Sequence, residues 1–276
     1  MALVDILIPT LDRPQELAVT LAGVAAQSLT DIRVLVADQS ETPARAAPAT
    51  ATLCRLIEAR GGSVDWHCRN GRHGVAEQRD FLLRQASAAR VLLLDDDVFM
   101  EPWVLAELHR TLEQERAGFV GAFPAGLSYL DDVRPEDQRV EFWDGPVRPE
   151  VVEPESPLWE RARLHAAANV LHAARDLPTE TVRRYKVAWV GACALYDRAK
   201  LAAVGGFSFW RQLPEDHAGE EVLVQNLLLR RWGGCAILPS GTYHAEAPTN
   251  IGEPGRSPAA NALRLLPRML ERYALH

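Results

Sequence analysis

The sequence predicts one α/β domain in which helices cover both faces of a mostly parallel sheet. Through the first 123 residues, short aliphatic runs alternate with segments of helical periodicity, which is the pattern of successive β–α units. One run, residues 91–94, is wholly aliphatic, as expected for a strand buried on both faces of a parallel sheet. The chain has 276 residues, 47% of them hydrophobic, which suffices for one large domain with a substantial core.

The first half of the chain supplies strands and helices in alternation. A strand at residues 4–8 is stopped by Pro9, and the lack of a basic flank or cleavage site argues against a signal peptide. The following helix carries Leu17, Leu21 and Val24 at helical spacing. Further strands are predicted at residues 32–36, 64–68, 91–94 and 119–123, and further helices at 51–59, 75–87 and 103–115.

The second half is less regular. Residues 124–185 mix frequent prolines with charged residues and aromatics, so we expect a packed insertion or a binding loop there. A strand-like run at 187–196 leads into a helix through Leu201, followed by a helix at 220–232 and a strand at 236–238. A mobile loop is predicted at 251–258, and the last, amphipathic helix carries Leu263, Leu266, Met269 and Leu270.

Composition argues against several classes of function. The formal net charge of -7 provides no broad basic footprint for a phosphate backbone, so no nucleic-acid partner is expected. No apolar run approaches the ~20 residues that a membrane span needs. The four cysteines are scattered and form no CxxC pair, which favours reduced thiols and a cytoplasmic protein.

Three adjacent carboxylates, Asp95, Asp96 and Asp97, directly follow the aliphatic strand at residues 91–94. Like charges this close repel one another unless a cation lies against them, and Mg²⁺ or Mn²⁺ prefers carboxylate oxygen together with substrate phosphates. In open α/β sheets the ligand crevice lies outside the carboxyl ends of the strands. The cluster therefore indicates a metal-assisted site, although an acidic turn that caps the next helix is an alternative.

The chain from about Val4 to His244 resembles the family 2 glycosyltransferases of the GT-A fold, with their motifs in the same order. These motifs are the strand-end loop at residues 8–13, the Val-Ala-Asp-Gln-Ser stretch at 36–40, the segment at 70–80, the aspartate cluster, the Gly-Gly-Phe turn at 205–207, the acidic pairs at 215–216 and 220–221, and Tyr243-His244. The resemblance implies one GT-A (Rossmann-like) domain over residues 1–245. It divides into a nucleotide-binding half (1–123), an insertion that meets the acceptor (124–185) and an acceptor and catalytic half (186–245), followed by the mobile loop and C-terminal helix (246–276).

The resemblance also implies which residues bind a nucleotide-sugar donor, UDP-linked or otherwise. Asp38 is expected to hydrogen-bond the nucleotide base, although an Asx-turn at a strand end is the structural alternative. Arg79 would face the diphosphate or brace the aspartates, since its fork geometry suits pairs of oxygens. The full expected set is Pro9, Thr10, Arg13, Asp38, Gly74, Arg79 and, at the ribose, Asp95 or Asp96.

The same resemblance assigns the metal and the general base. Asp97 would coordinate Mn²⁺ or Mg²⁺ at the diphosphate, with His244 as a second ligand, since neutral imidazole is a competent ligand for Mn²⁺. Glu221 is the expected base, with Glu220 and Asp216 as alternatives. Acidic residues also stabilise a helix N-terminus without any catalytic role.

The resemblance, together with the aspartate cluster, implies metal-dependent transfer of a sugar from a nucleoside-diphosphate sugar to an unknown acceptor hydroxyl, and the resemblance implies inversion. Trp143 and Trp159, in the insertion, are where we expect the acceptor. A sugar-phosphate nucleotidyltransferase is one alternative, but the loop after the first strand lacks the glycines of that class. A non-catalytic nucleotide-sugar-binding paralogue is the other, suggested by Gln39, Asp80 and Glu221. The donor sugar, the acceptor and a homodimer are left open.

Overall fold

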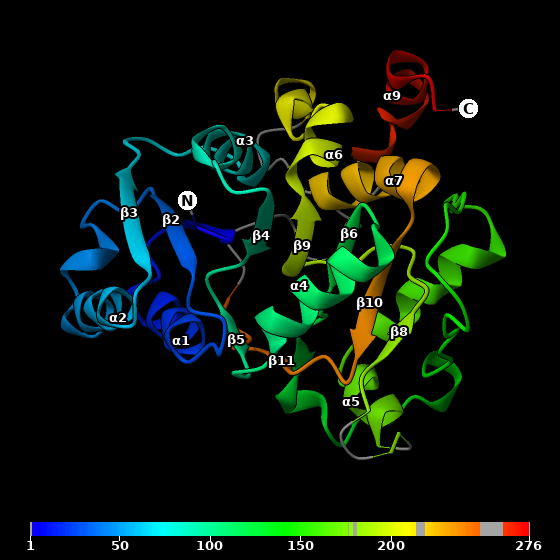
Figure 1. Ribbon diagram of the computed structural model, residues 1–276, viewed down its shortest axis with the longest axis horizontal. Helices are drawn as coiled ribbons and strands as arrows, with labels where there is room; N and C mark the ends of the chain where they lie inside the picture. Colours follow the sequence, from blue (N-terminus) through cyan, green and yellow to red (C-terminus); the bar gives the residue numbers. More distant parts are fainter. Residues whose placement is uncertain (1, 176, 179–180, 214–218, 249–261, 276) are drawn as a thin grey trace.

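The computed structural model describes residues 2–175, 177–178, 181–213, 219–248 and 262–275. An eight-stranded sheet crosses it in the order β3-β2-β1-β4-β9-β6-β10-β8 (Figure 1). The strands are β1 (Val4–Thr10), β2 (Ile32–Asp38), β3 (Ser63–Cys68), β4 (Arg90–Leu94), β6 (Phe119–Gly121), β8 (Arg183–Tyr185), β9 (Cys193–Asp197) and β10 (Gly234–Leu238). Strands β1 to β4 pair in parallel, as do β6 and β10, whereas β9 is antiparallel to both neighbours and β8 is antiparallel to β10. The predicted mostly parallel sheet is confirmed.

Helices cover both faces of the sheet, as predicted (Figure 1). One face carries α1 (Pro14–Ala25), α2 (Pro48–Ala59) and α4 (Val104–Glu115), whose apolar residues join a single buried cluster. The other face carries α3 (Val75–Gln85), α6 (Arg198–Ala203), α7 (Glu220–Trp232) and α9 (Leu266–Tyr273), which contribute to a second cluster. The predicted helices therefore have the expected positions, and their boundaries differ by only a few residues.

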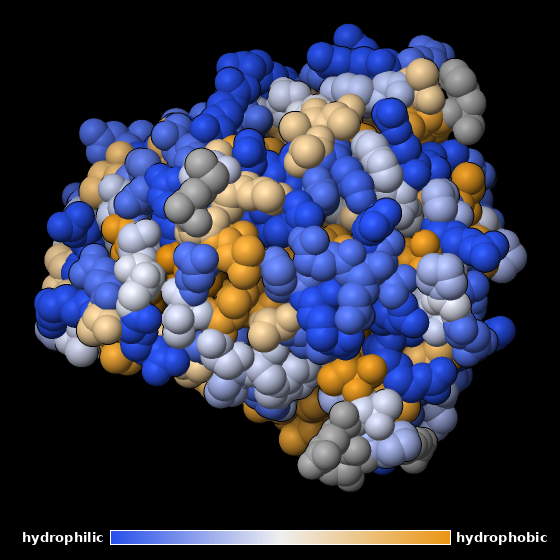
Figure 2. Space-filling model, viewed as in Figure 1, coloured by the Kyte–Doolittle hydropathy of each residue, from blue (hydrophilic) through white to orange (hydrophobic). Residues whose placement is uncertain are grey.

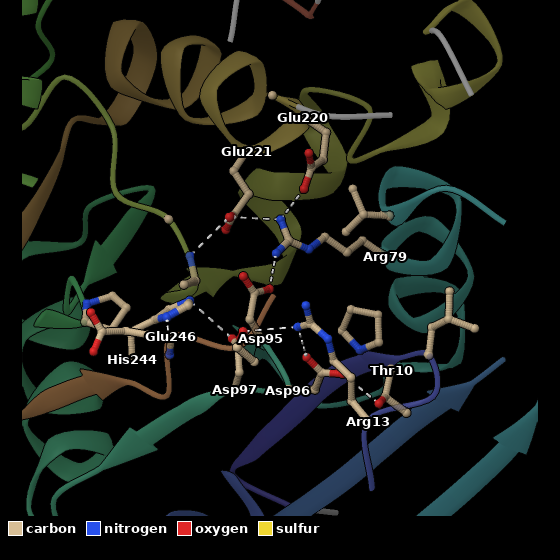
Figure 3. A pocket seen from close by; sticks show the side chains of 18 of the residues that line it. Thr10, Arg13, Arg79, Asp95, Asp96, Asp97, Glu220, Glu221, His244 and Glu246 are labelled. Atoms are coloured by element: carbon tan, nitrogen blue, oxygen red, sulfur yellow. Dashed lines mark hydrogen bonds and ion pairs between the residues drawn. The ribbon is translucent and has the colours of Figure 1, made fainter. Parts of the chain in front are cut away.

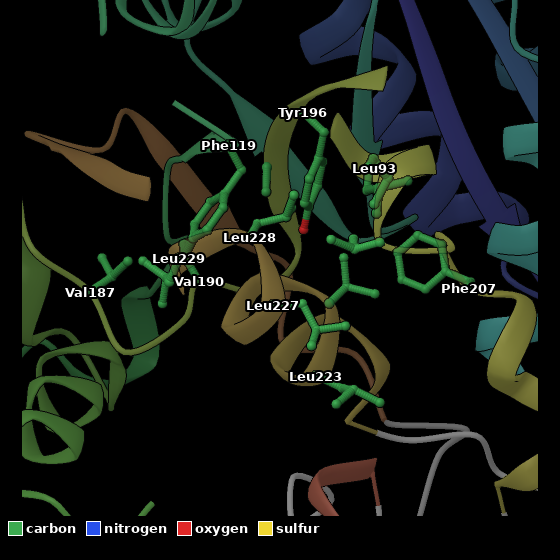
Figure 4. Close-up of a cluster of buried hydrophobic side chains, with 14 of the residues drawn as sticks. Leu93, Phe119, Val187, Val190, Tyr196, Phe207, Leu223, Leu227, Leu228 and Leu229 are labelled. Carbon is green, nitrogen blue, oxygen red and sulfur yellow. The ribbon is translucent and has the colours of Figure 1, made fainter. Parts of the chain in front are cut away.

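The central strands alternate between these two clusters. Leu93 of β4 packs under α7 with Leu223 and Leu227, close to Tyr196 of β9 (Figure 4), whereas the neighbouring Leu92 joins the opposite cluster. Successive strand residues point to opposite faces, so an all-aliphatic strand fills both cores. This explains why residues 91–94 contain no polar position.

Strand β1 extends past Pro9, contrary to the prediction that it stops there. Pro9 and Thr10 continue the parallel register with β2, opposite Ala37 and Asp38. Pairing with β4 ends at Leu7, so Pro9 lies where β1 has become an edge on that side. A proline is tolerated there because its missing N–H breaks no ladder bond.

A small three-stranded sheet was not predicted. It consists of β5 (Val98–Met100), β11 (Thr242–His244) and β7 (Ala125–Gly126), in the order β5-β11-β7. Tyr243 and His244 therefore lie in a strand rather than in a loop past the last strand. His244 pairs with Val98, the residue after the aspartate cluster, so this sheet brings the end of the chain's second half to the aspartates.

Residues 124–185 form a packed insertion, one of the two predicted outcomes. Short 3-10 turns, the helix α5 (Asn169–Ala174) and β8 make up most of its regular structure. Val152, Leu164 and Val170 from the insertion join the cluster under α7. The loop predicted to be mobile, at 251–258, lies outside the described residues.

The molecular surface is mainly hydrophilic on the face shown in Figure 2, with one larger apolar area left of the centre and smaller ones elsewhere. Within the described part of the chain, every helix is too short or too polar to cross a bilayer. All four cysteines are free thiols, and two of them, Cys193 and Cys235, are buried.

Candidate active site

A cavity of about 1530 Å³ opens at the carboxyl ends of β1 and β4 and beside the first turn of α7. Its volume exceeds the roughly 300–1,000 Å³ of a site for one small molecule, so there is room for two substrates. Of the predicted site residues, the structure brings these to the lining: Pro9, Thr10, Arg13, Gly74, Arg79, Asp95, Asp96, Asp97, Glu220, Glu221 and His244.

Asp96 is held by the loop after β1. Thr10 Oγ1 donates to Asp96 Oδ2 at 2.6 Å, and Arg13 Nη1 lies 3.2 Å from Oδ1. Burial raises the pKa of Asp96 to about 7, against the lowering effects of Thr10 and Arg13. Both carboxylate oxygens of Asp96 thus have partners within the protein, so its position is fixed by the loop.

Asp97 lies between Arg13 and His244. Arg13 Nη1 is 3.1 Å from Asp97 Oδ2, and His244 Nε2 is 3.4 Å from Asp97 Oδ1 (Figure 3). Burial raises the pKa of Asp97, and its neighbours His244 and Arg13 oppose that rise. The backbone N–H of Glu246 donates to His244 Nδ1 at 2.8 Å, which directs Nε2 toward Asp97.

These residues offer a divalent cation two protein donors. Among the described residues no three His, Cys, Asp or Glu side chains gather as a complete metal site. A carboxylate and an imidazole nevertheless match what Mg²⁺ or Mn²⁺ takes when substrate phosphates and water complete its shell. His244 can serve as a metal ligand only after one change in its hydrogen bonding. Because its Nδ1 accepts from the Glu246 N–H, the ring carries its proton on Nε2. Ligation through Nε2 therefore requires that the Glu246 amide release Nδ1.

Arg79 is the centre of the second charged group. From α3, its Nη2 lies 2.6 Å from Asp95 Oδ1 and its Nη1 lies 2.9 Å from Glu221 Oε2, while Nη1 also donates to Glu220 (Figure 3). The Arg79 side chain is only 3% exposed. Burial lowers the pKa of Arg79, but the negative charges of Glu221, Glu220 and Asp95 raise it by more, so the net shift is upward. Arg79 thus holds Asp95 and the two glutamates together; of the aspartate cluster that it was predicted to brace, it contacts Asp95.

Three carboxylates around one arginine leave an excess of negative charge. Burial raises the pKa of Glu220 to about 7, although Arg79 opposes the rise. Burial likewise raises the pKa of Glu221. One of these carboxyl groups therefore keeps its proton until near neutral pH, as coupled sites do.

Glu221 is positioned by the segment before β9 as well as by Arg79. Glu221 Oε2 accepts from the Ala192 backbone N–H at 3.3 Å, and the Tyr196 hydroxyl lies 3.5 Å from Oε1. Helix α7 begins at Glu220 after Gly219, which has the positive φ of 84° that glycine tolerates. Both glutamates thus lie in the first helical turn, where the macrodipole favours negative charge. Asp216, the other predicted base, lies outside the described residues.

Asp38 is not among the lining residues, although it was predicted to bind the base. Its carboxylate, on a residue only 2% exposed, accepts from Ser40 N at 2.9 Å, Ala44 N at 2.7 Å and Trp66 Nε1 at 3.1 Å. Through these three hydrogen bonds, the Asp38 carboxylate holds the loop after β2 in place. The next residue, Gln39, does line the cavity, and its Oε1 accepts from His73 N at 2.6 Å.

The expected aromatic residues do not line the cavity either. Trp143 packs against the core on the α1 face, with Lys186 over its ring, and Trp159 packs against the opposite core. Different aromatic residues provide the lining: Phe123, Tyr129, Trp189 and Trp210. Sequence patterns gave no sign of this difference, since an aromatic in an irregular segment packs inward as readily as it lines a cavity.

Comparisons with known proteins agree with the fold. The family described as Glycosyl transferase family 2 matches residues 5–161. No curated protein sequence matches the chain.

Three solved structures, all too distant in sequence to show more than the fold, share its architecture. TarS of S. aureus with UDP-GlcNAc has 14% identity and a TM-score of 0.54, over 98% of this chain and 66% of that one. The mannosyltransferase PcManGT from Pyrobaculum calidifontis with GDP-Man and Mn²⁺ has 17% identity and a TM-score of 0.52, over 99% and 73%. GalNAc-T7 with UDP, GalNAc and Mn²⁺ has 16% identity and a TM-score of 0.56, over 98% and 49%. The chain spans 43% of a longer TarS chain.

Proposed function

The chain belongs to glycosyl transferase family 2, and we propose that it transfers a sugar, with inversion, from a nucleoside-diphosphate sugar to an acceptor hydroxyl with the help of a divalent cation. The observation that carries the proposal is the meeting of Asp97 and His244 beside the Arg79–Glu221 ion pair in one cavity. That arrangement supports a cation site and a general base at the same crevice.

The nucleotide is assigned to the half of the cavity made by residues 1–123. Pro9, Thr10 and Arg13 line this half together with Gly74. Because the Asp38 carboxylate is occupied by the chain's own donors, the base contact is assigned to Gln39. Its Oε1 is held by the His73 amide, so Nε2 is the end that can donate to a base carbonyl. Uracil and guanine, the bases of the donors bound to TarS and PcManGT, both carry such a carbonyl.

Asp97 and His244 would hold Mn²⁺ or Mg²⁺ with the diphosphate oxygens, and the bound cation would offset the charge that develops on the leaving diphosphate. Arg13 already bridges Asp96 and Asp97, so the aspartates are preorganised. Asp95, with its side chain 35% exposed and one oxygen free of Arg79, is the aspartate placed to meet the ribose.

Glu221 takes the proton of the acceptor hydroxyl. The acceptor oxygen forms a bond to the anomeric carbon while the bond from that carbon to the diphosphate breaks, and the proton goes to Glu221. Attack from the side opposite the leaving group inverts the anomeric configuration. Glu220 is the alternative base, since it also lines the cavity. The acceptor half of the cavity is assigned to the segments 124–185 and 186–245.

Measuring metal-dependent turnover of a panel of nucleotide sugars tests the function. Turnover with UDP- or GDP-sugars that requires Mn²⁺ or Mg²⁺ and is abolished in Asp97→Asn supports it. Tight nucleotide binding without turnover would instead support a non-catalytic paralogue, and sugar 1-phosphate uridylylation a nucleotidyltransferase. The free thiols favour a reducing compartment such as the cytoplasm.

A further inference from the structure

The cavity has two chemically different halves. In Figure 3, Thr10 and Arg13 lie on one side of the aspartates, and His244 and Glu246 lie on the other. The first side is lined by cations, Arg13 and Arg72. The second side is lined, within the described part of the chain, by aromatic, small and acidic residues, with Arg79 as the one arginine beside Glu220 and Glu221: Phe123, Tyr129, His165, Trp189, Glu220, Glu221 and Glu246 are its other larger members.

This second side is unsuited to an anion. Glu220, Glu221 and Glu246 contribute carboxylates, and the nearest buried cation, Arg79, is already engaged by three carboxylates and only 3% exposed. Burial lowers the pKa of His165 to about 3, so its imidazole stays neutral. Arg211 stacks on Trp210 but is not part of the lining. A phosphate or carboxylate bound here would face three carboxylates, and the cation that the described lining supplies, Arg79, is already paired with two of them.

Three rings form a continuous wall on this side. The rings of Phe123 and His165 are stacked, with centroids 4.4 Å apart and planes within 6°, and His165 meets Trp189 edge-on with centroids 6.2 Å apart. His165 Nε2 is fixed by the Tyr185 hydroxyl at 2.8 Å. A wall of aromatic faces with a few polar groups suits a ligand that is apolar on its faces and polar at its edges.

Trp189 lies beside the general base. A Cβ built on Gly191 would lie 3.2 Å from Trp189 Cζ3 and 3.6 Å from Glu221 Oε2, so the indole and the carboxylate flank the same glycine. The intervening Val190 is fixed to α7, because its N–H donates to Gln225 Oε1 at 2.7 Å and its carbonyl accepts from Gln225 Nε2 at 2.6 Å. The Trp189 indole and the Glu221 carboxylate are therefore held in a fixed position relative to each other.

We propose that the acceptor is an uncharged carbohydrate, one ring of which stacks on Trp189 and presents a hydroxyl to Glu221. The proposal rests on the proposed function, in which Glu221 is the base. A sugar ring combines C–H faces for the indole with hydroxyl edges for Glu221 and Glu246, and it brings no negative charge to the acidic side. The negative charge of the described lining disfavours lipid phosphates and phosphorylated polymers as acceptors.

Matched pairs of acceptors test the proposal. With a nucleotide sugar that the protein turns over, transfer is measured to maltose and glucose and to their phosphorylated partners, maltose 1-phosphate and glucose 6-phosphate. We expect transfer to neutral compounds, with the phosphorylated ones at least tenfold poorer in kcat/KM. Transfer that prefers a phosphorylated compound overturns the proposal and leaves the donor assignment intact. Absence of both transfer and saturation-transfer NMR contact with neutral saccharides, in the presence of UDP and Mn²⁺, overturns it too. A protein that binds no nucleoside diphosphate at all contradicts the proposed function itself.

Substitutions of Trp189 test whether its indole is the surface on which the acceptor ring stacks. Trp189→Ala should raise the KM for the neutral acceptor at least tenfold, and Trp189→Phe should recover most of that loss because it keeps a ring. Trp143→Phe, at a tryptophan outside the cavity lining, is the matched control and should leave the KM unchanged. Equal KM values for Trp189→Ala and Trp143→Phe in folded protein would contradict the assignment.

Discussion

Arg79 of α3 forms a buried ion pair with Glu221 of α7, with 2.9 Å between Nη1 and Oε2. The pair joins a helix of the nucleotide-binding half to the helix that carries the candidate base. Its geometry makes the position of Glu221 depend on a residue that belongs to the other substrate's side of the cavity.

Replacing Arg79 should therefore destabilise the fold and abolish transfer. Arg79→Met leaves Asp95, Glu220 and Glu221 without their shared cation, and removing one partner of a buried pair costs about 3–5 kcal/mol. Urea unfolding and transfer rate measure the two effects. Arg84→Met, on the same helix but with a 63% exposed side chain, is the control and should change stability by less than about 0.5 kcal/mol. Equal stability of the two variants would contradict the bracing role.

The metal prediction concerns Asp97 and His244. A nucleoside diphosphate at ~100 times its dissociation constant should stabilise the protein by about 2.7 kcal/mol, and chelation of Mn²⁺ by EDTA should remove most of that stabilisation. Asp97→Asn should lose the Mn²⁺-dependent part and all turnover. A melting temperature that responds to UDP or GDP equally with and without metal in the unsubstituted protein would refute the cation site.

The sequence was enough to predict the main sheet apart from β8, and many of the residues that line the cavity, for identifiable reasons. The aliphatic strand at 91–94 and the acidic start of α7 are local patterns, and the structure has β4 at Arg90–Leu94 and α7 at Glu220–Trp232. Strands β5, β7 and β11 have only two or three residues, too few to show a periodicity, and they exist because they pair with one another. His244 meets Asp97 only through that pairing.

Side-chain direction beyond a strand end could not be predicted. Asp38 is the last residue of β2, and a one-residue difference decides whether a side chain points into the loop or into the cavity. The sequence favoured Asp38 as the base ligand, whereas the structure has Gln39 in the lining. Whether Trp189 or Trp143 lines the cavity likewise depends on how the insertion packs, which no local pattern reports.

Gln39 should contribute to base recognition. Gln39→Ala removes the Nε2 donor assigned to a base carbonyl, and one such hydrogen bond contributes about 0.5–1.5 kcal/mol, so the donor KM should rise about 2- to 12-fold. The acceptor KM should stay the same. Kinetics with UDP- and GDP-linked donors measure the change, and an unaltered donor KM would remove Gln39 from the nucleotide site.

The carboxylates around Arg79 should make stability depend on pH. The pKa of Glu220 is raised to about 7, whereas an unfolded glutamate titrates near 4.3. Between these values the folded protein holds a proton that the unfolded chain has lost, so stability falls as pH rises from about 5 to 7 and then levels off. The loss should be on the order of 4 kcal/mol. Glu220→Gln should flatten this slope in thermal melts of the nucleotide-free protein, and an unchanged slope would contradict the assignment.

Gln225 should act as a positioning residue for the base. It is fully buried, clamps Val190 and donates from Nε2 to the Tyr196 hydroxyl at 2.7 Å. That contact leaves the hydroxyl proton free to face Glu221 Oε1, 3.5 Å away, and a donor to a carboxylate favours its ionised form. Removing the donor in Tyr196→Phe should therefore raise the pKa of Glu221, so that the acid limb of the kcat–pH profile moves to higher pH.

Gln225→Leu should do the same and lower kcat by about 10- to 100-fold, the loss expected when a reacting group is misplaced, while the donor KM is retained. Asn226→Leu, at the adjacent buried position of α7, controls for general damage to the helix. If its acid limb moves as far as that of Tyr196→Phe, the effect belongs to packing and not to the hydroxyl that faces the base.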